Sequence, residues 1–155
     1  MMVTTNQSPA TTRTLEAISW ALLVTVMAGG GSLLMLLTGG GELTDHEEQF
    51  FRAGHAHAGV LSAIGIIYAN ALGRTTLPAR RQVLAWFTYL AGVLLQSGGM
   101  FVHMLIGEPG ERSAGTLMTA FGGLLIAVGV LFLAWRIFIA RHGFPDPSRT
   151  EISRD

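Results

Sequence analysis

The sequence contains no cysteine and no lysine, and charged residues make up only 13% of its 155 residues. Without cysteine there can be no disulfides, thiolate catalysis, iron–sulfur clusters or thiolate zinc sites, so histidine, methionine, carboxylate or backbone groups must hold any metal or cofactor. A water-soluble domain carries roughly a quarter charged residues. The low charge therefore excludes a secreted globular protein, a nucleic-acid binder and a disordered regulator.

Hydrophobic residues make up 50% of the chain and gather in four stretches, 15–37, 53–72, 83–106 and 116–140. Each is near the ~20 residues that an α-helix needs to cross a bilayer. We therefore predict an all-α, multi-pass protein of the cell membrane, an integral membrane antiparallel four-helix bundle. The predicted parts are a flexible N-terminal segment 1–14, a transmembrane domain 15–140 and a cytoplasmic tail 141–155.

The distribution of arginine predicts the orientation of the chain in the membrane. The connector 73–81 holds Arg74, Arg80, Arg81 and no acidic residue. The positive-inside rule places such a connector in the cytoplasm. Both termini then lie on the cytoplasmic side (N-in and C-in), and the two other loops, which are acidic on balance, face outward.

Small residues mark candidate helix contacts, because close backbone approach drives helix association in lipid. The sequence has 20 glycines, more than the packing of four helices requires. Some are therefore predicted to line a homo-oligomer interface or to leave room for a flat cofactor. The candidate contacts are Gly29 to Gly31, Ala58 with Ser62, Gly98 with Gly99, and Gly122 with Gly123.

The segment from Phe50 to Gly59 places two histidines and an arginine at the outer start of the second stretch. Ionisable residues inside a membrane span mark a functional site by default. His103 stands near the outer end of the third stretch, and in an antiparallel arrangement we expect it at the depth of His57. His46 lies among acidic residues of the first outer loop, where we expect it to be solvated.

His55 and His57 cannot bind one ion together, because two residues along a helix correspond to about 200° of rotation. His55 shares its face with Gly59 and Ser62, which suits close helix packing. His57 shares its face with bulkier side chains, which suits a cofactor or the wall of a pocket. The pattern favours His57 as a ligand and leaves His55 as the alternative.

A single imidazole is a poor site for Zn²⁺ or Cu²⁺, which take three or four ligands. One axial imidazole suffices for haem iron, because the porphyrin supplies four nitrogens. Arg52 is placed to pair with a haem propionate at the water interface. Two ligand-type histidines without cysteine therefore favour haem b, with His57 or His55 on the iron. The alternative is structural: imidazoles that only hydrogen-bond to carbonyls or water.

The run Phe51-Arg52-Ala53, followed by His55 or His57 and then Gly59, opens the second of four hydrophobic stretches. In a chain of this length, the pattern resembles the styrene oxide isomerases. The resemblance implies haem b bound between the subunits of a trimer by one histidine of the second helix, here His57 or His55. It also implies ferric iron acting as a Lewis acid on an epoxide oxygen, with rearrangement to an aldehyde and no net redox change.

The chain departs from the pattern of that family on two helices. Ala63 stands where the family has an asparagine after the ligand histidine. The segment 94–103 holds neither the tyrosine nor the acidic residue of the family's third helix. Gln96 or His103 is expected to replace them as a catalytic residue.

Three functions follow from these residues. The leading prediction is a homo-oligomeric membrane haem protein that isomerises an apolar small-molecule epoxide reached through the membrane lipid. The second is a haem electron-transfer protein with His103 as the second axial ligand. The third is a non-catalytic accessory subunit of a membrane complex, which would be colourless when purified.

Overall fold

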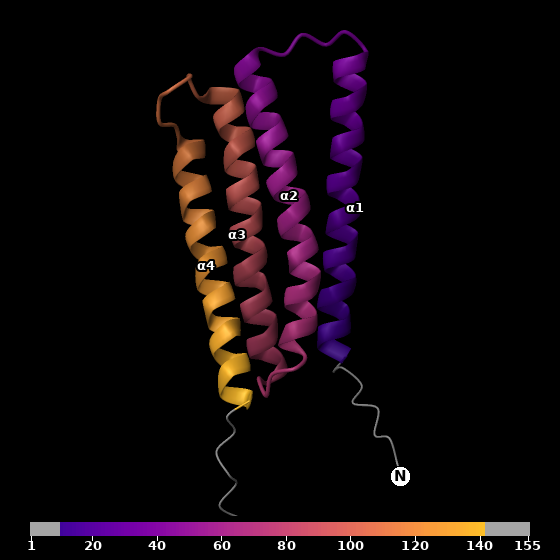
Figure 1. Cartoon of the computed structure of the whole chain (residues 1–155), viewed down its shortest axis with the longest axis vertical. Coiled ribbons are helices and arrows are strands. Elements are labelled where there is room, and N and C mark those ends of the chain that lie inside the picture. The colour runs from indigo at the N-terminus through magenta and orange to yellow at the C-terminus, as the bar shows by residue number, and fades with distance from the viewer. Residues whose placement is uncertain (1–9, 142–155) are drawn as a thin grey trace, which may run out of the picture.

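The computed structural model describes residues 10–141, which form four long helices joined by short loops (Figure 1). The all-helical fold expected from the sequence is confirmed. Consecutive helices run in opposite directions, and we call the end that carries loops 39–44 and 107–113 the outer end and the opposite end the inner end. The helices are α1 (Ala10–Thr38), α2 (Asp45–Leu72), α3 (Ala79–Ile106) and α4 (Ala114–Arg141).

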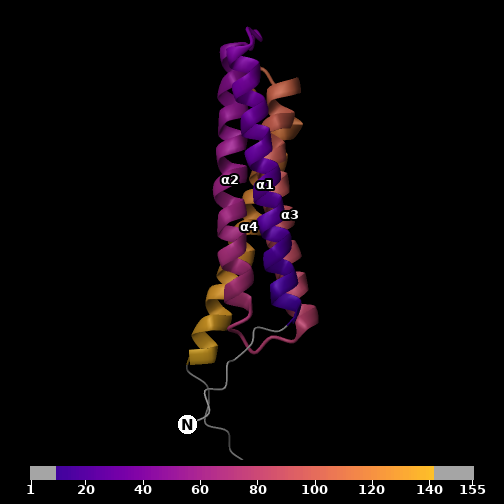
Figure 2. The ribbon, with the colours of Figure 1, turned by 90° about the vertical axis from the view of Figure 1, so that its right-hand side faces the viewer.

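The helices stand side by side in chain order in Figure 1, and they overlap when viewed from the side of α1 in Figure 2. α2 and α3 occupy the centre, α1 packs against α2, and α4 packs against α3. α4 makes only a small contact with α2, and within residues 10–141 α1 and α4 do not touch. The sides of α2 and α4 that face each other across α3 are therefore largely uncovered by other helices.

Three of the helices, α1, α3 and α4, are long and apolar enough to cross a membrane. α2 is as long as α3, but its outer half carries acidic residues and histidines. Large apolar side chains point outward on every helix, and more than half of the surface of each of these four is exposed: Trp20, Val60, Phe87 and Phe121. This combination is that of a membrane protein, whose apolar outer surface faces lipid.

Two helices begin earlier than the hydrophobic stretches that predict them. α1 begins at Ala10, so residues 10–14 of the predicted N-terminal segment are helical. α2 begins at Asp45, eight residues before the expected start at residue 53. Residues 1–9 and 142–155 lie outside the described residues, and so does nearly all of the predicted tail.

A capping box sets the start of α2. The Thr44 hydroxyl accepts a hydrogen bond from the Glu47 backbone N–H at 3.2 Å, and the Thr44 N–H donates to the Glu47 carboxylate at 2.8 Å. This reciprocal pair satisfies two backbone donors that a helix start leaves open. Hydrogen bonds from the Thr44 backbone and hydroxyl hold the pKa of the Glu47 carboxyl below its usual range. Residues 45–52 therefore extend α2 beyond its apolar part.

Glycines bring α3 and α4 into backbone contact along a line that we call the glycine seam: Gly92, Gly99, Gly115 and Gly122. A Cβ atom added at Gly99 would lie 2.6 Å from the carbonyl oxygen of Gly115, and one added at Gly92 would lie 2.9 Å from that of Gly122. Only glycine permits such an approach. The sequence prediction is confirmed for Gly99 and Gly122, whereas Gly98 has open space beside it.

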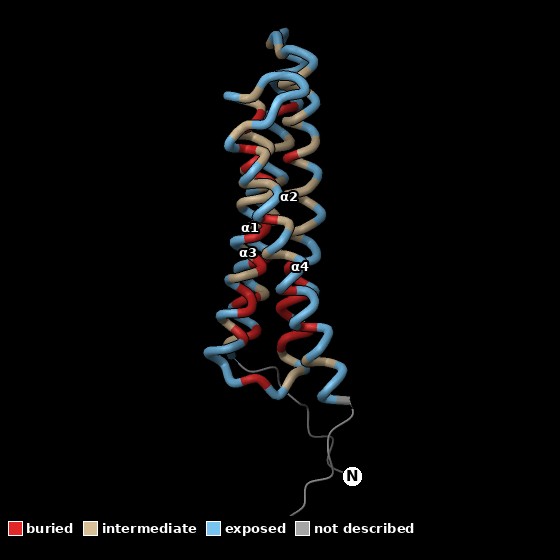
Figure 3. Tube along the Cα trace, turned by 90° about the vertical axis from the view of Figure 1, so that its left-hand side faces the viewer, coloured by how far each residue is buried: buried red, intermediate tan, exposed pale blue. Residues whose placement is uncertain are grey.

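The buried core lies in the inner half of the molecule, where Figure 3 shows buried positions along the facing sides of the helices. The rings of Tyr68 and Tyr89 stack at 4.7 Å between centroids. The Tyr68 hydroxyl donates to the Gly129 carbonyl of α4 at 3.0 Å, and the Trp86 indole N–H donates to the Ser19 hydroxyl of α1 at 3.1 Å. These bonds satisfy polar groups that would otherwise be buried without a partner.

The glycine seam predicts a large difference between two adjacent glycines. Gly122→Ala should destabilise the protein by about 1–3 kcal/mol, because the new methyl group would meet the backbone of Gln96 and Gly92, which cannot give way. Gly123→Ala is the matched control, since its Cβ would meet only the Gln96 side-chain oxygen, at 3.6 Å. Thermal unfolding in detergent measures both, and equal midpoints would contradict the seam.

Candidate functional site

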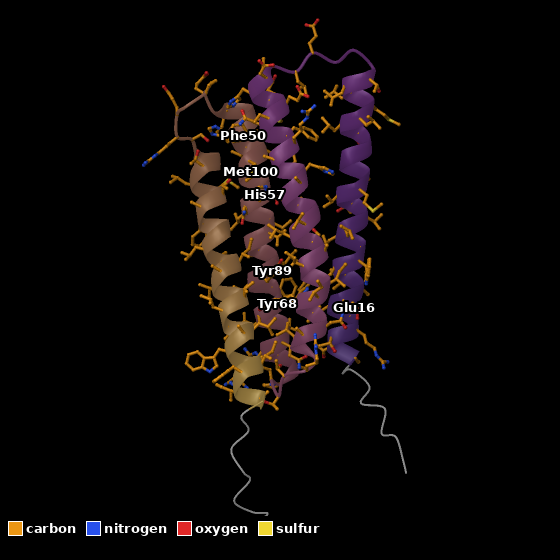
Figure 4. All side chains as sticks on the ribbon, in the orientation of Figure 1. Glu16, Phe50, His57, Tyr68, Tyr89 and Met100 are labelled. Carbon is orange, nitrogen blue, oxygen red and sulfur yellow. The ribbon has the colours of Figure 1, made fainter. Side chains whose placement is uncertain are left out.

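His57 lies on the outer half of α2, below Phe50 and Met100 in Figure 4. Its Nδ1 is 2.8 Å from the backbone carbonyl oxygen of Ala53, one turn earlier on the same helix. A carbonyl oxygen only accepts, so Nδ1 carries the proton and Nε2 presents its lone pair. Within residues 10–141 no hydrogen bond engages that Nε2. This bond therefore favours the tautomer in which Nε2 of the half-buried imidazole can act as a metal ligand.

His55 points the other way, against α1. A Cβ atom added at Gly30 would lie 2.7 Å from the His55 Nε2 and 2.8 Å from its Cε1. The imidazole edge that would bind a metal therefore lies against the α1 backbone. The sequence left His55 and His57 as alternatives, and the two rings differ in their surroundings: the Nε2 edge of His55 lies beside Gly30 of α1, whereas His57 is bonded through Nδ1 to the Ala53 carbonyl.

His46, Phe50 and His103 form a ring cluster at the outer end, which we call the outer aromatic cluster. The ring centroids of Phe50 and His103 are 4.3 Å apart, and those of His46 and His103 are 5.3 Å apart. His103 is only 6% exposed, and its Nδ1 lies 2.7 Å from the Ser113 hydroxyl. The Nε2 of His46 is buried without a hydrogen-bond partner. His46, which the sequence analysis expected to be solvated, is therefore partly buried in this cluster.

The outer aromatic cluster also corrects the predicted depth of His103. His103 packs against Phe50, which precedes His57 by seven residues, or about 10 Å along a helix. One turn after Phe50, Gly54 faces Met100 and Phe101. The two histidines therefore do not lie at one depth, because α2 extends further outward than its hydrophobic stretch indicates.

Gln96, rather than His103, lies at the depth of His57. Gly54 of α2 lies level with Met100 of α3. His57 is three residues further inward on α2, and because both helices rise equally per residue, the position level with it on α3 is about three residues inward of Met100. That position is next to Gln96. Gln96, Met100 and His103 follow one another at helical spacing and so share one face of α3. The face turns toward the gap between α2 and α4, since Met100 meets Gly54 of α2 and the Gln96 side-chain oxygen lies near Gly123 of α4.

A cavity of about 510 Å³ opens over the outer part of this gap. Phe50 of α2, Met100 and His103 of α3, and Thr116 and Thr119 of α4 line it. Its volume is within the range of sites that take small molecules. Phe50 and His57 lie two turns apart on one face of α2, so the cavity and the free Nε2 belong to the same side of the molecule.

Arg52 and Gly59, which the sequence placed at the cofactor, lie on other faces of α2. Arg52 is 64% exposed and forms an ion pair with Glu48. A Cβ atom added at Gly59 would face Val26 of α1 at 3.7 Å, so Gly59 shares the side of His55. Neither residue is brought next to His57 in this chain.

Sequence reasoning placed His46 in a loop and missed the contacts of His46 and Phe50 with His103. The signal that could have found them is Thr44-x-x-Glu47, the capping-box pattern, which predicts a helix start eight residues before the apolar stretch. Within residues 10–141 no group of three or more histidine or acidic side chains could hold a metal ion.

No family model, no curated protein and no solved structure matches this chain.

The outer aromatic cluster should depend on the capping box. Thr44→Ala removes the hydroxyl cap and should destabilise the outer turn of α2 by about 1 kcal/mol. Faster amide hydrogen exchange at residues 46–50 would report the change. Thr75→Ala at the inner loop, whose hydroxyl donates to the Leu72 carbonyl, is the control and should leave those amides unchanged. Unchanged exchange in Thr44→Ala would contradict the role of the cap.

Proposed function

We propose that this protein is a membrane haem b protein in which His57 is the axial ligand. The observation that carries the proposal is the hydrogen bond from His57 Nδ1 to the Ala53 carbonyl, which leaves Nε2 with a free lone pair. The resemblance of the segment from Phe51 to Gly59 to the styrene oxide isomerases points to the same cofactor. A lone imidazole matches a porphyrin, which supplies the other four nitrogens.

The surroundings of His57 suit a large apolar cofactor. Val60 and Ile67 of α2 point outward with more than half of their surfaces exposed, and Ile64 is 40% exposed on the face of His57. Apolar surface of this kind beside a polar ligand is typical of sites for hydrophobic cofactors. We further propose that copies of the chain associate through this surface, as a trimer by the resemblance, and enclose the haem between subunits.

The reaction that we propose is the isomerisation of an apolar epoxide to an aldehyde. Ferric haem, when bound, would supply a Lewis acid for the epoxide oxygen. The step breaks one carbon–oxygen bond, shifts a hydride between neighbouring carbons and forms a carbonyl, so atoms and electrons balance without an oxidant. Gln96 carries the amide that can orient an oxygen at the depth of His57, and the substrate reaches this side from the lipid.

Electron transfer through a haem with two histidine ligands has less support. His103 is the second ligand that this function would require, but its ring is enclosed by Phe50 and His46 and its Nδ1 is held by Ser113. It also lies about two turns outward of His57. An accessory subunit without haem is the remaining alternative, and the spectrum described next separates it from the proposal.

The absorption spectrum of the detergent-purified protein, produced with ample haem, tests the ligand. A Soret band is expected in the wild type, lost in His57→Ala and retained in His55→Ala, because the Nε2 edge of His55 lies against Gly30 of α1. Loss in His55→Ala alone would assign the ligand to the other histidine. A colourless wild type would overturn the haem proposal and favour the accessory subunit.

The isomerase proposal is tested by incubating the coloured protein with styrene oxide and measuring phenylacetaldehyde. Five-coordinate iron and turnover are expected, and removal of the Gln96 amide in Gln96→Leu should reduce kcat by about 10²-fold or more if it orients the oxygen. Six-coordinate iron without turnover would contradict the isomerase and support electron transfer.

We also propose that the protein is a multi-pass protein of the cell membrane with its inner end in the cytoplasm. At that end Arg74 lies in the α2–α3 loop, Arg80 and Arg81 lie in the first turn of α3, and residues 73–81 hold no acid, which the positive-inside rule places in the cytoplasm. The chain lacks cysteine, so a maleimide can label only the single cysteine that is introduced. In intact cells, a membrane-impermeant maleimide should label Glu111→Cys on the outer loop and not Arg74→Cys. The reverse pattern would overturn the orientation.

A further inference from the structure

A second cavity lies at the inner end, between α3 and α4, away from His57. Its volume is about 400 Å³, and we call it the inner groove. Apolar side chains form most of its walls, and two arginines belong to its lining: Leu77, Leu84, Val128, Phe132, Arg81 and Arg136. Leu84 and Val128 are more than half exposed, so the groove opens to the surface that faces lipid.

The two arginines of the inner groove have no carboxylate partner within residues 10–141. The ion pair of Arg52 with Glu48 lies at the opposite end of the molecule. Arg136 donates to the Thr76 hydroxyl at a long 3.4 Å, and its Nε is buried without a hydrogen-bond partner. Within these residues the terminal nitrogens of Arg136 donate only this long hydrogen bond, so they remain available to an anionic ligand in the groove.

The groove also has the dimensions of a lipid chain site. Arg81 stands in the first turn of α3, and the lining continues on that helix to Thr88, about 10 Å deeper. On α4 it runs from Arg136 to Val128, about 12 Å along the helix. The two arginines therefore lie at the inner end of the helices, and the apolar walls of the groove lie nearer the middle of the membrane. A phospholipid has the same order, with a charged headgroup at the membrane surface and apolar chains toward the middle.

We propose that the inner groove binds an anionic phospholipid, with its phosphate on Arg81 and Arg136 and the upper part of an acyl chain along Leu84, Val128 and Phe132. Guanidinium groups recognise phosphate through paired hydrogen bonds. A zwitterionic lipid offers the same chain, but its own cationic group offsets the charge that the arginines attract. The inference goes beyond the haem function and does not depend on it.

Native mass spectrometry of the detergent-solubilised protein tests the proposal with two lipids of identical acyl chains, phosphatidylglycerol and phosphatidylcholine. The wild type should bind phosphatidylglycerol about tenfold more tightly, since each of the two arginines near the headgroup should contribute about threefold. The double variant Arg81→Gln/Arg136→Gln should lose the preference. An equal affinity of the wild type for both lipids would overturn the site.

The matched control is Arg74→Gln/Arg80→Gln, which removes two charges at the same end outside the groove lining. It should keep the preference for phosphatidylglycerol. If both double variants lose the preference equally, a diffuse attraction explains it and the groove does not. Should Arg136→Gln fail to keep the helical fold by circular dichroism, Arg81→Gln alone should still lower the preference about threefold.

The chain-binding part is tested separately from the charges. Thr88→Phe fills the deep end of the groove and should weaken the binding of both lipids, whereas Thr14→Phe should not, because this exposed threonine of α1 lies outside the groove. Glycerol 1-phosphate, a headgroup without chains, should not displace phosphatidylglycerol. If glycerol 1-phosphate displaced phosphatidylglycerol at equal concentration, the groove would bind phosphate alone and the proposed acyl-chain contacts would be wrong. The lipid readout requires no haem, so either proposal can fail alone.

Discussion

Backbone contact between α3 and α4 at the glycine seam is the constraint on which the rest of the structure depends. In lipid, apolar burial gives no net drive for helix association, so close van der Waals contact has to hold the helices together. Because Gly92, Gly99, Gly115 and Gly122 hold α4 on α3, α4 meets α2 only in a small region where Tyr68 donates to Gly129. The gap left between α2 and α4 toward the outer end is where the outer cavity opens, over the shared face of Gln96, Met100 and His103.

The two histidines of α2 show how neighbours on one helix acquire different roles. Rotation by about 200° turns His55 toward α1 and His57 toward the α4 side. Packing against Gly30 engages the Nε2 edge of His55, whereas a bond to Ala53 engages the Nδ1 of His57 and leaves its Nε2 free. The chemical difference arises from what each ring touches, because the residue type is the same.

Sequence reasoning predicted the helices, because apolar run length is a direct signal. It misplaced the depth of His103 because it took the start of the apolar stretch as the start of the second helix. The capping box of Thr44 and Glu47 starts α2 eight residues earlier, so His103 packs against the polar outer part of α2. It left His55 and His57 open, because the contact with Gly30 comes from another helix. The inner groove was not predicted at all: Arg81 and Arg136 are distant in sequence and meet only through the packing of α3 on α4.

The contact of His55 with Gly30 links two positions on different helices. An alanine at position 30 would bring its methyl group within 2.8 Å of the imidazole, so the ring would have to swing away from α1 or be replaced by a smaller side chain. Among related chains the two positions are therefore expected to covary, with bulk gained at one and lost at the other. Such correlated variation would reveal the register of α1 on α2 even where the rest of the sequence has diverged.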